Sequence, residues 1–385
     1  MFYLRLVLRN VFRARLRAGL TILGLVIAIL AFGLLQTVVR AWYAGSDMSS
    51  ASRLFTRNSI SLTFSMPLYY RERIAAQPGV TSVGVSNWFG GIWREPQNFF
   101  AQFATDIALL ARQYPEFVFD PAQYADLMRD RQGAAIGREL AALYGFKLGD
   151  RITLKGTIYP GNWEFNVRAI YDGRDDTAIT RQMYFHYDYL NETLKTSAPA
   201  RANQVGVFVV QIADATAGAE ISKQIDDGFR SSLAETLTET EKAFQLGFIS
   251  MVETIVVAIR GVSYVVIVII MAVAANTMAM TARERIAEYA TLKALGFAPG
   301  TVAALVMAEA LLLAAIGAAI AMALLGPVAQ GFHAATVKVF AKFPVVPETY
   351  ALQAACGLAV GLVAGALPAW HSARVRIVDG LRRVG

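Results

Sequence analysis

Four apolar stretches, each about as long as a membrane span, stand out along the chain. At a rise of about 1.5 Å per residue, a helix of roughly 20 residues crosses a hydrocarbon core of about 30 Å. We therefore expect four transmembrane helices. The first is expected to be retained as an anchor, because its apolar run is longer than that of a signal peptide. The stretches are Ala18–Val39, Gly261–Met280, Thr301–Leu325 and Thr349–Trp370.

Between the first and second stretches, helical patterns alternate with strand patterns. "PLYYRERIAAQPGVTSVGVSN" is a helical pattern ended by Pro78-Gly79, followed by a strand of alternating apolar and polar residues. "AAIGRELAALYGFKLGDRITLKG" repeats this order, with a turn at Gly149-Asp150. Such alternation predicts α/β layers, and not an immunoglobulin-like sandwich. The expected fold class is an α-helical membrane protein with four transmembrane helices and a large α/β extracytoplasmic (periplasmic) domain between helices one and two.

The basic charge lies beside the apolar stretches. The chain has 36 Lys and Arg and 29 Asp and Glu, but residues 41–249 hold 20 basic and 23 acidic side chains, so we expect no nucleic-acid partner. Lys and Arg are enriched in the cytoplasmic flanks of membrane spans, which places both termini and residues 281–300 in the cytoplasm. The basic residues concerned are Arg5, Arg9, Arg13, Arg15, Arg17, Arg283, Arg285, Lys293, Arg374, Arg376, Arg382 and Arg383.

Two flanking segments are expected to be helical without being fully apolar. Arginines at intervals of four predict a basic amphipathic helix over residues 1–17, lying in the headgroup plane. A simple topology signal is an equal alternative. The pattern from Thr236 to Arg260 predicts a polar stalk helix that continues as the second span, with Arg260 near the outer interface or, alternatively, a functional charge within the membrane.

A short charged segment, "MTARERIAEYATLKALGFAPG" at residues 280–300, separates the second and third apolar stretches. Thr281 and Glu284 match a capping box, so a helix restarts there or, alternatively, runs through uninterrupted. Gly296 followed by Pro299 is a stop signal for the helix.

This short helix has only a narrow apolar face, formed by Ile286, Tyr289 and Ala290. Such a helix would suit docking on a cytoplasmic protein, with charged residues at the rim and Tyr289 as the anchor. On composition alone, a solvated connector between two spans is the favoured alternative.

The charged segment also resembles the signature that follows the second span in MacB/FtsX-type ABC transporter permeases, the type VII group with LolC and DevC. "RNVFRARLRAGLTILGLVIAI" and "PAWHSARVRIVDGLR" are similar to the opening and closing segments of that family. The resemblance covers nearly the whole chain, except "NWFGGIWREPQNFFAQFATD" at residues 87–106, whose role the sequence leaves open. The matching residues of the signature are Arg283, Glu284, Arg285, Glu288, Leu292, Lys293, Ala294, Leu295 and Gly296.

The resemblance implies that the charged segment is a coupling helix that docks on an ABC ATPase. No G-x-x-x-x-G-K-[ST] motif occurs in the chain, so ATP and Mg²⁺ are expected on a separate ATPase subunit, with no cofactor, metal or catalytic residue in this chain. Two ATPase copies and a second permease are implied, the latter another copy of this chain or a homologous one. The expected coupling residues are Arg283, Glu284, Arg285, Glu288, Tyr289, Lys293 and Gly296.

Two further features lie within the spans. Glu309 is an acid in the third span, where we expect a structural bond to the charged segment, with proton relay as the alternative. Gly357, Gly361 and Gly365 follow one another at intervals of four in the fourth span. Small residues at this spacing permit close helix–helix packing in lipid, either within the chain or across a dimer.

The leading functional hypothesis is a permease subunit that works by mechanotransmission: ATP hydrolysis on the partner drives a periplasmic conformational change. Export of a lipid, lipoprotein, peptide or drug, with membrane lipids and a periplasmic adaptor (membrane fusion protein) as further partners, is what the resemblance implies. The alternative is an FtsX-like regulatory complex that activates a periplasmic enzyme without transport. In both cases the expected location is the bacterial inner membrane.

The patterns and the resemblance together define the expected boundaries. They are a cytoplasmic amphipathic helix at 1–17, span one at 18–40, a periplasmic MacB-like α/β domain at 41–250, the stalk and span two at 251–280, a cytoplasmic coupling helix at 281–300, span three at 301–325, a short periplasmic loop at 326–348, span four at 349–370 and a cytoplasmic tail at 371–385.

Overall fold

The structure is a computed structural model in which the chain forms two compact units. Residues 1–44 and 251–385 make up the helical unit, and residues 45–250 make up the α/β unit. Of the expected tail, residues 379–385 with Arg382 and Arg383 lie outside the described residues. The described residues are 2–11, 13–43, 49–174, 178–251, 253–337, 340 and 343–378.

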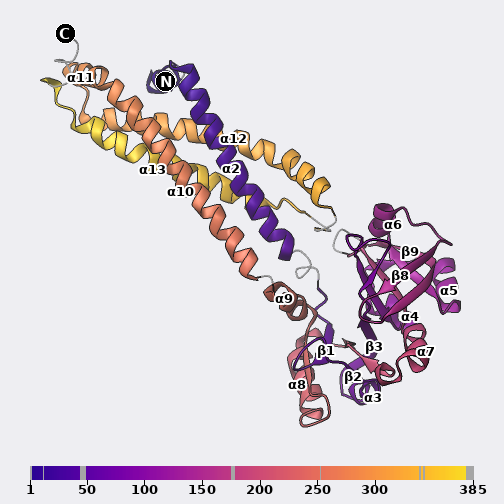
Figure 1. The fold of residues 1–385 in the computed structure, drawn as a ribbon. Helices are drawn as coiled ribbons and strands as arrows, with labels where there is room; N and C mark the ends of the chain where they lie inside the picture. Colours follow the sequence, from indigo (N-terminus) through magenta and orange to yellow (C-terminus); the bar gives the residue numbers. More distant parts are fainter. Residues whose placement is uncertain are drawn as a thin grey trace. The chain divides into compact units, whose positions relative to one another are not determined.

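Four long helices form most of the helical unit (Figure 1). Each is long and apolar enough to cross a membrane, and their order along the chain matches the four expected spans. α12 packs along α2 and α13, and α10 packs along the same two helices. The four are α2 (Arg15–Tyr43), α10 (Glu253–Glu284), α12 (Pro299–Thr336) and α13 (Pro347–Arg374).

Small residues line the contact between α12 and α13. A Cβ atom added at any of three glycines of α13 would lie between 2.6 and 2.9 Å from an alanine Cβ of α12. Small side chains let two helix backbones approach closely enough to gain van der Waals contact in lipid. Of the two alternatives, the glycine stripe therefore packs within the chain. The facing pairs are Gly357 with Ala318, Gly361 with Ala314, and Gly365 with Ala310.

Several element boundaries differ from those expected. The N-terminal helix α1 (Phe2–Val11) is shorter than residues 1–17, and its buried Val7 and Val11 pack on Leu305 of α12. α12 continues through Pro327 to Thr336, so the first half of the expected loop at 326–348 is helical. Proline is tolerated inside membrane helices because neighbouring groups can satisfy the freed carbonyl.

The expected stalk helix also begins later than the sequence pattern indicated. Thr236–Thr240 form strand β13, and helix α9 spans Glu241–Met251. Alternate β-branched residues favour an extended strand, and the hydroxyl groups of Thr238 and Thr56 lie 2.9 Å apart across the paired strands. Val252, between α9 and α10, lies outside the described residues.

The α/β unit is built on one mixed sheet (Figure 1), whose strand order is β13-β1-β12-β3-β5-β10-β7-β9-β8-β4, with β6 paired to β9. Most neighbours are antiparallel, but β5 with β10 and β7 with β9 are parallel. A separate pair is formed by β2 and β11. The strands are β1 (Arg53–Asn58), β2 (Met66–Pro67), β3 (Val80–Trp88), β4 (Gly91–Ile92), β5 (Ala101–Thr105), β6 (Phe117–Val118), β7 (Gly133–Gly137), β8 (Arg151–Gly156), β9 (Gly161–Gly173), β10 (Gln182–His186), β11 (Gln204–Val205), β12 (Val207–Ile212) and β13.

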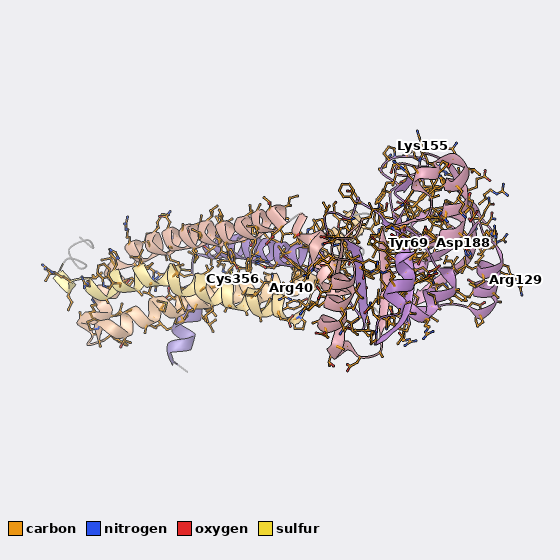
Figure 2. The ribbon with its side chains drawn as sticks, turned by 90° about the horizontal axis from the view of Figure 1, so that it is seen from below. Arg40, Tyr69, Arg129, Lys155, Asp188 and Cys356 are labelled. Atoms are coloured by element: carbon orange, nitrogen blue, oxygen red, sulfur yellow. The ribbon has the colours of Figure 1, made fainter. Side chains whose placement is uncertain are left out.

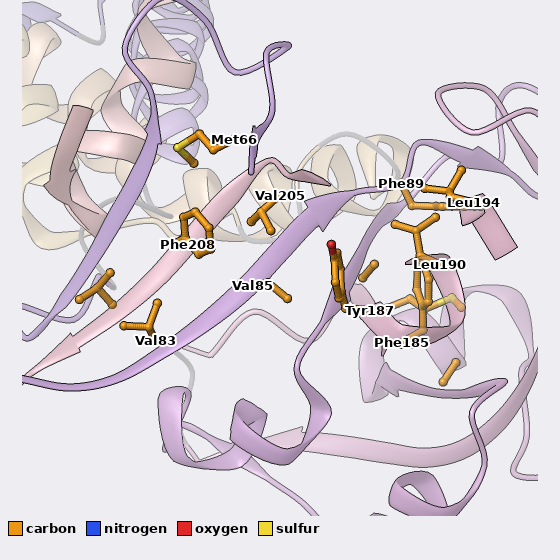
Figure 3. Packing of buried hydrophobic residues seen from close by; sticks show 14 of the residues in the cluster. Met66, Val83, Val85, Phe89, Phe185, Tyr187, Leu190, Leu194, Val205 and Phe208 are labelled. Atoms are coloured by element: carbon orange, nitrogen blue, oxygen red, sulfur yellow. The ribbon is translucent and has the colours of Figure 1, made fainter. Parts of the chain in front are cut away.

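Helices cover both faces of this sheet because successive strand side chains point to opposite sides. In β10, Met183 and Phe185 join one hydrophobic cluster, whereas Tyr184 joins another. The first cluster includes residues of α3, α6, α7 and α8, and part of it, around Phe185 and Leu190, is drawn in Figure 3. The second lies under α4 and α5. The helices are α3 (Tyr70–Ala75), α4 (Ile107–Gln113), α5 (Pro121–Arg129), α6 (Arg138–Tyr144), α7 (Tyr187–Ser197) and α8 (Gly218–Gly228).

The aromatic-rich segment at residues 87–106 contributes chiefly to the first cluster. Phe89 is fully buried, and its ring lies 5.3 Å from that of Phe185 in an edge-on arrangement. Phe100 is also buried, whereas Trp88 and Phe99 remain partly exposed beside each other. Trp93 packs against the first cluster and Phe103 against the second, so four of the segment's six aromatic residues supply core packing.

Candidate functional site

The charged segment between α10 and α12 contains one short helix, α11 (Ile286–Ala294). α10 passes through Thr281, whose hydroxyl donates to the carbonyl of Thr277 at 3.0 Å, so the expected capping box does not form. The break comes at Arg285, with φ −100° and ψ 15°. Of the two alternatives, the uninterrupted helix is correct as far as Glu284, and a new helix follows.

Gly296 ends α11 with a φ of +93°, a left-handed conformation that glycine adopts at little cost. Its N–H donates to the carbonyl of Lys293 at 3.0 Å, and the N–H of Phe297 donates to that of Leu292 at 3.1 Å. This pair of hydrogen bonds is a Schellman motif. α12 then begins at Pro299, so the short turn between α11 and α12 is tightly defined.

Arg285 and Glu309 form the central ion pair of the site. The Nη1 atom of Arg285 lies 2.7 Å from Oε2 and 3.0 Å from Oε1 of Glu309, and both side chains are mostly buried. The Nε atom of Arg285 donates to Glu288 at 3.0 Å, and the amide of Asn10 donates to Glu309 at 2.9 Å. A buried acid is stable when it is paired and hydrogen-bonded. Glu309 thus makes the bond to the charged segment that the sequence led us to expect.

Two N-terminal arginines extend this network. Arg17 donates two hydrogen bonds to Glu284, of 2.6 and 3.1 Å, and thereby joins the start of α2 to the end of α10. Arg13 contacts Glu288 at 2.5 Å and joins the α1–α2 turn to α11. Arginine suits both contacts because its planar fork matches a carboxylate.

Tyr289 has a different role from the one expected. Only 3% of it is exposed, because it packs in a cluster with Ala282, Val302, Val306 and Ala369. Its ring therefore faces the other helices of the unit, and the expectation of an exposed docking anchor is wrong.

Lys293 fixes α11 to the end of α13. Its Nζ atom donates to the carbonyls of Ala373 and Val375 at 2.7 and 2.8 Å. Carbonyl groups at a helix C-terminus lack partners within the helix and attract cations. α11 is consequently held by Lys293 on α13, by Arg285 on α12 and by Glu288 on the α1–α2 turn.

Charge and burial agree with these assignments. Burial alone would raise the pKa of Glu288, but the hydrogen bond and charge of Arg285, together with Arg13, outweigh it and lower the pKa. Burial raises the pKa of Tyr289 to about 12 and lowers that of Lys293. Glu288 is therefore ionised at neutral pH and Tyr289 is neutral, as a packed residue should be.

The segment's exposed surface lies at the turn that follows α11. Leu295 is 73% exposed there, and Arg283, near the end of α10, is exposed as well. Ala298 and Pro299 are exposed next to it. Of the seven expected coupling residues, most make contacts within the chain, whereas Leu295 presents an apolar side chain outward.

Sequence reasoning missed Asn10, Arg13 and Arg17 as partners of the charged segment. The four-residue spacing of the N-terminal arginines predicts an amphipathic helix or a topology signal, and it does not indicate which side chains the arginines bind. Leu295 was part of the recognised signature, yet nothing in the pattern distinguished its exposure from that of Leu292, which is half-buried. Among the residues that the structure describes, no group of three or more His, Cys, Asp or Glu side chains is placed to hold a metal ion.

Two family models match the chain. The model of the MacB-like periplasmic core domain matches residues 18–227, and the model of the FtsX-like permease C-terminal region matches residues 260–377. The second match contains α11, most of α10, and all of α12 and α13. No curated protein matches the sequence.

Solved structures similar to this chain include two extracytoplasmic domains. The periplasmic region of MacB from Actinobacillus actinomycetemcomitans is 8% identical, with a TM-score of 0.36, and the match covers 52% of this chain and 94% of that one. The extracellular domain of the noncanonical ABC-type transporter YknZ from Gram-positive bacteria is 15% identical, with a TM-score of 0.34, covering 49% and 98%.

The two family models place an extracytoplasmic core domain and a membrane permease region in one chain, in the order that the helices and the sheet show. The predicted fold class, with four apolar helices and a mixed α/β domain between the first and second, is confirmed. Membership also implies an ABC ATPase partner and a multi-pass location in a bacterial inner membrane. This chain belongs to the MacB/FtsX-type family of ABC transporter permeases.

Proposed function

We propose that this chain is the permease subunit that converts ATP hydrolysis on a separate ATPase into a conformational change of its α/β unit. The observation that carries the proposal is the architecture of the α11 segment. It is bound to α12 and to the α1–α2 turn by ion pairs and to α13 by hydrogen bonds, yet its terminal turn exposes Leu295. A displacement applied to such a segment at Leu295 would be transmitted to the helices that it contacts.

The contacts of α11 indicate how such a displacement would spread. Arg285 is bound to Glu309 of α12, and Lys293 is bound to the end of α13. α12 and α13 are joined along their length by the glycine–alanine contact. Charge-assisted hydrogen bonds are short and directional, so the helices should move together with α11.

The turn itself suits docking in a groove of the ATPase. An exposed leucine on a rigid turn loses little conformational freedom on binding, and buried apolar residues supply most of an interface's energy. Arg283 lies at the rim, where it adds orientation more than affinity. In this assembly Leu295 is the docking contact in place of Tyr289, the partner binds ATP and Mg²⁺, and α11 and both termini lie in the cytoplasm.

A second copy of this chain is proposed as the other permease. α10 is the least buried of the four long helices, and Asn276 lies exposed on it between apolar neighbours. Its amide makes no hydrogen bond to any described residue. An unsatisfied amide is costly in hydrocarbon, but two parallel copies of α10 would let two such amides bond to each other.

The polar residues buried in the helical unit favour transport without a water-filled path through one chain. Gln36 bonds to Ser263 of α10, and Gln353 bonds to the carbonyl of Ile29. Each of these groups joins two helices. We therefore propose an amphiphilic cargo that is taken up outside the membrane, such as a lipid, lipoprotein, peptide or drug, with a periplasmic adaptor. In an FtsX-like regulatory role, the α/β unit would activate a periplasmic enzyme without transport, and α11 would couple it to the ATPase in the same way.

Co-purification from native membranes tests the coupling. We expect the wild-type chain to retain a P-loop ATPase and the Leu295→Asp variant to lose about tenfold or more of it, because a charge cannot be buried in an apolar groove. Leu233→Asp is the matched control, since Leu233 is also exposed, at 90%, but lies in the α/β unit. Equal ATPase recovery with Leu295→Asp and wild type would refute the docking assignment. Mass spectrometry of the wild-type sample would separate a lipid cargo from a bound periplasmic enzyme.

A further inference from the structure

One arginine of the α/β unit is as deeply buried as its hydrophobic core. Arg53, the first residue of β1, is 1% exposed. Its Nε atom donates to Oε2 of Glu241 at 2.9 Å, and its Nη2 atom donates to Oε1 of Glu116 at 2.7 Å. Its Nη1 atom donates to the main-chain carbonyl of Gln113, and the guanidinium lies 4.2 Å from the centre of the Tyr114 ring. All three guanidinium nitrogens are therefore in use.

Glu241 lies where the chain leaves the α/β unit. It is the first residue of α9, the last helix before α10, and it follows β13, which pairs with β1 so that Leu54 faces Thr240. Its Oε2 atom also accepts from the N–H of Ser50 at 2.8 Å, in the segment that leads from α2 into β1. The Arg53–Glu241 ion pair thus joins β1, where the chain enters the α/β unit, to the start of α9, where the chain leaves it.

The other contacts of Arg53 belong to the second hydrophobic cluster. Gln113 is the last residue of α4, where a cation stabilises the unpaired carbonyls. The Tyr114 ring stacks on Phe117 at 5.1 Å between centroids, and Phe117 begins the strand that pairs with β9. Arg53 therefore connects α9 with the core beneath α4 and α5.

We infer that Arg53 is a positioning residue that makes α4 and the second cluster follow any displacement of α9. This inference rests on the proposed ATP-driven motion. When α9 shifts, the Glu241 carboxylate shifts with it, and separating it from a desolvated guanidinium would leave two buried charges unpaired. This cost of unpairing is avoided when Arg53 moves together with Glu241 and the Gln113 carbonyl moves together with Arg53.

A second ion pair, which links β1 to β13 further along these strands, supplies a matched comparison. Arg57 donates from Nε to Glu239 at 2.8 Å, and both side chains are 20% exposed. Its Nη1 atom donates to the carbonyl of the adjacent Asn58 at 3.2 Å. Arg57 therefore joins β1 to β13, but among the described residues it makes no hydrogen bond or ion pair with α4.

The test uses the full chain with its co-purified ATPase in lipid nanodiscs, in a Cys356→Ala background. Spin labels at Lys195→Cys on α7, which packs on the first cluster, and Arg129→Cys on α5 (Arg129 is labelled in Figure 2) report the distance between the helices on the two faces of the sheet, which changes when the α4 and α5 side moves with α9. We expect wild type and Arg57→Lys to show the same shift in this distance between the nucleotide-free and ATP-bound states. Arg53→Lys should lose most of the shift while ATP hydrolysis persists, because an ammonium cannot span the same partners.

A second variant guards against misfolding of Arg53→Lys. Glu116 is the more exposed carboxylate of the pair, and Glu116→Gln leaves Arg53 bound to Glu241. We expect this variant to fold and to lose part of the shift. A full ATP-dependent shift in both Arg53→Lys and Glu116→Gln would overturn the inference alone. No shift in the wild type would overturn the proposed function as well as the inference.

Discussion

Two arginine centres, one in each unit, are built from the same kinds of residue. Arg285 in the helical unit and Arg53 in the α/β unit each bind two glutamates, and each guanidinium lies over a tyrosine ring, at 5.4 and 4.2 Å from its centre. They differ in depth: the Arg53 side chain is 2% exposed and the Arg285 side chain 15%. The Arg53 centre is enclosed by a folded core, whereas the Arg285 centre joins helix ends.

The difference suggests what each centre contributes. Burying a fully enclosed ion pair costs desolvation free energy, and its contacts break only when the surrounding core opens. A centre at helix ends, near water, can rearrange with less cost because solvent can replace a lost partner. We therefore assign the Arg285 centre to receiving a displacement, and the Arg53 centre to carrying it through a unit that stays folded.

Removing the deeper arginine should have the largest effect. Arg53→Met leaves Glu241 buried without its partner, which should lower the unfolding free energy of the α/β unit by about 3–5 kcal/mol. Pulse proteolysis of the full chain in urea measures this. In the double variant with Glu241→Gln, much of the loss should be recovered, and an equal loss in the single and double variants would contradict the pairing.

The Arg285 centre should respond less in stability. Arg285→Met should cost about 1–3 kcal/mol, because Glu309 keeps its bond from Asn10 and is nearer to water. Hydrogen exchange of the α11 amides should become faster, since the helix loses its tie to α12. If α11 exchanges at the wild-type rate in Arg285→Met, this ion pair does not hold the helix.

The contrast between the centres also marks the limits of sequence reasoning. The four spans and the glycine stripe could be predicted, because lipid selects apolar residues and close helix contacts select small ones. Arg53 could not, because "SRLFTRN" holds two arginines with the same local pattern, and only the tertiary fold buries one of them. The partner of Tyr289 could not be predicted for the same reason: helical periodicity identifies an apolar face but not the partner that covers it.

The helical unit relies on close packing as well as on its charged centre. Gly361→Ile would place a branched side chain where even a Cβ would lie 2.9 Å from Ala314, at a cost of about 1–3 kcal/mol. Urea denaturation in detergent, followed by tryptophan fluorescence, measures this cost. Gly331→Ala is the control in α12, because its added Cβ has nothing within 4 Å. Equal stability of the two variants would show that the α12–α13 contact is loose.

A more exposed ion pair, between Asp130 and Arg168, should contribute the least to stability. Asp130 accepts from Arg168 at 2.8 Å and from Asn166 at 2.9 Å. Burial alone would raise its pKa, but these hydrogen bonds outweigh it and lower the pKa. A lowered carboxyl pKa stabilises the fold above the ordinary aspartate value, and this stabilisation is lost as pH falls through the lower, folded-state value.

Asp130→Asn should therefore destabilise the α/β unit by less than about 1 kcal/mol at neutral pH, given the exposure of the pair. The difference from wild type should shrink as the pH falls below about 4. Pulse proteolysis of the full chain at several pH values measures both effects. A difference that grows on acidification would contradict the sign of this shift.

Photocrosslinking at Leu295 tests the central claim most directly. A photoreactive residue at this position in the full chain, activated in native membranes, should form a crosslink to a protein that contains a P-loop. The same residue at Leu20, which is exposed on the apolar surface of α2, should label lipid or a neighbouring membrane helix. If Leu295 crosslinks only to lipid, or to an extracytoplasmic protein, then the turn after α11 is not where an ATPase docks.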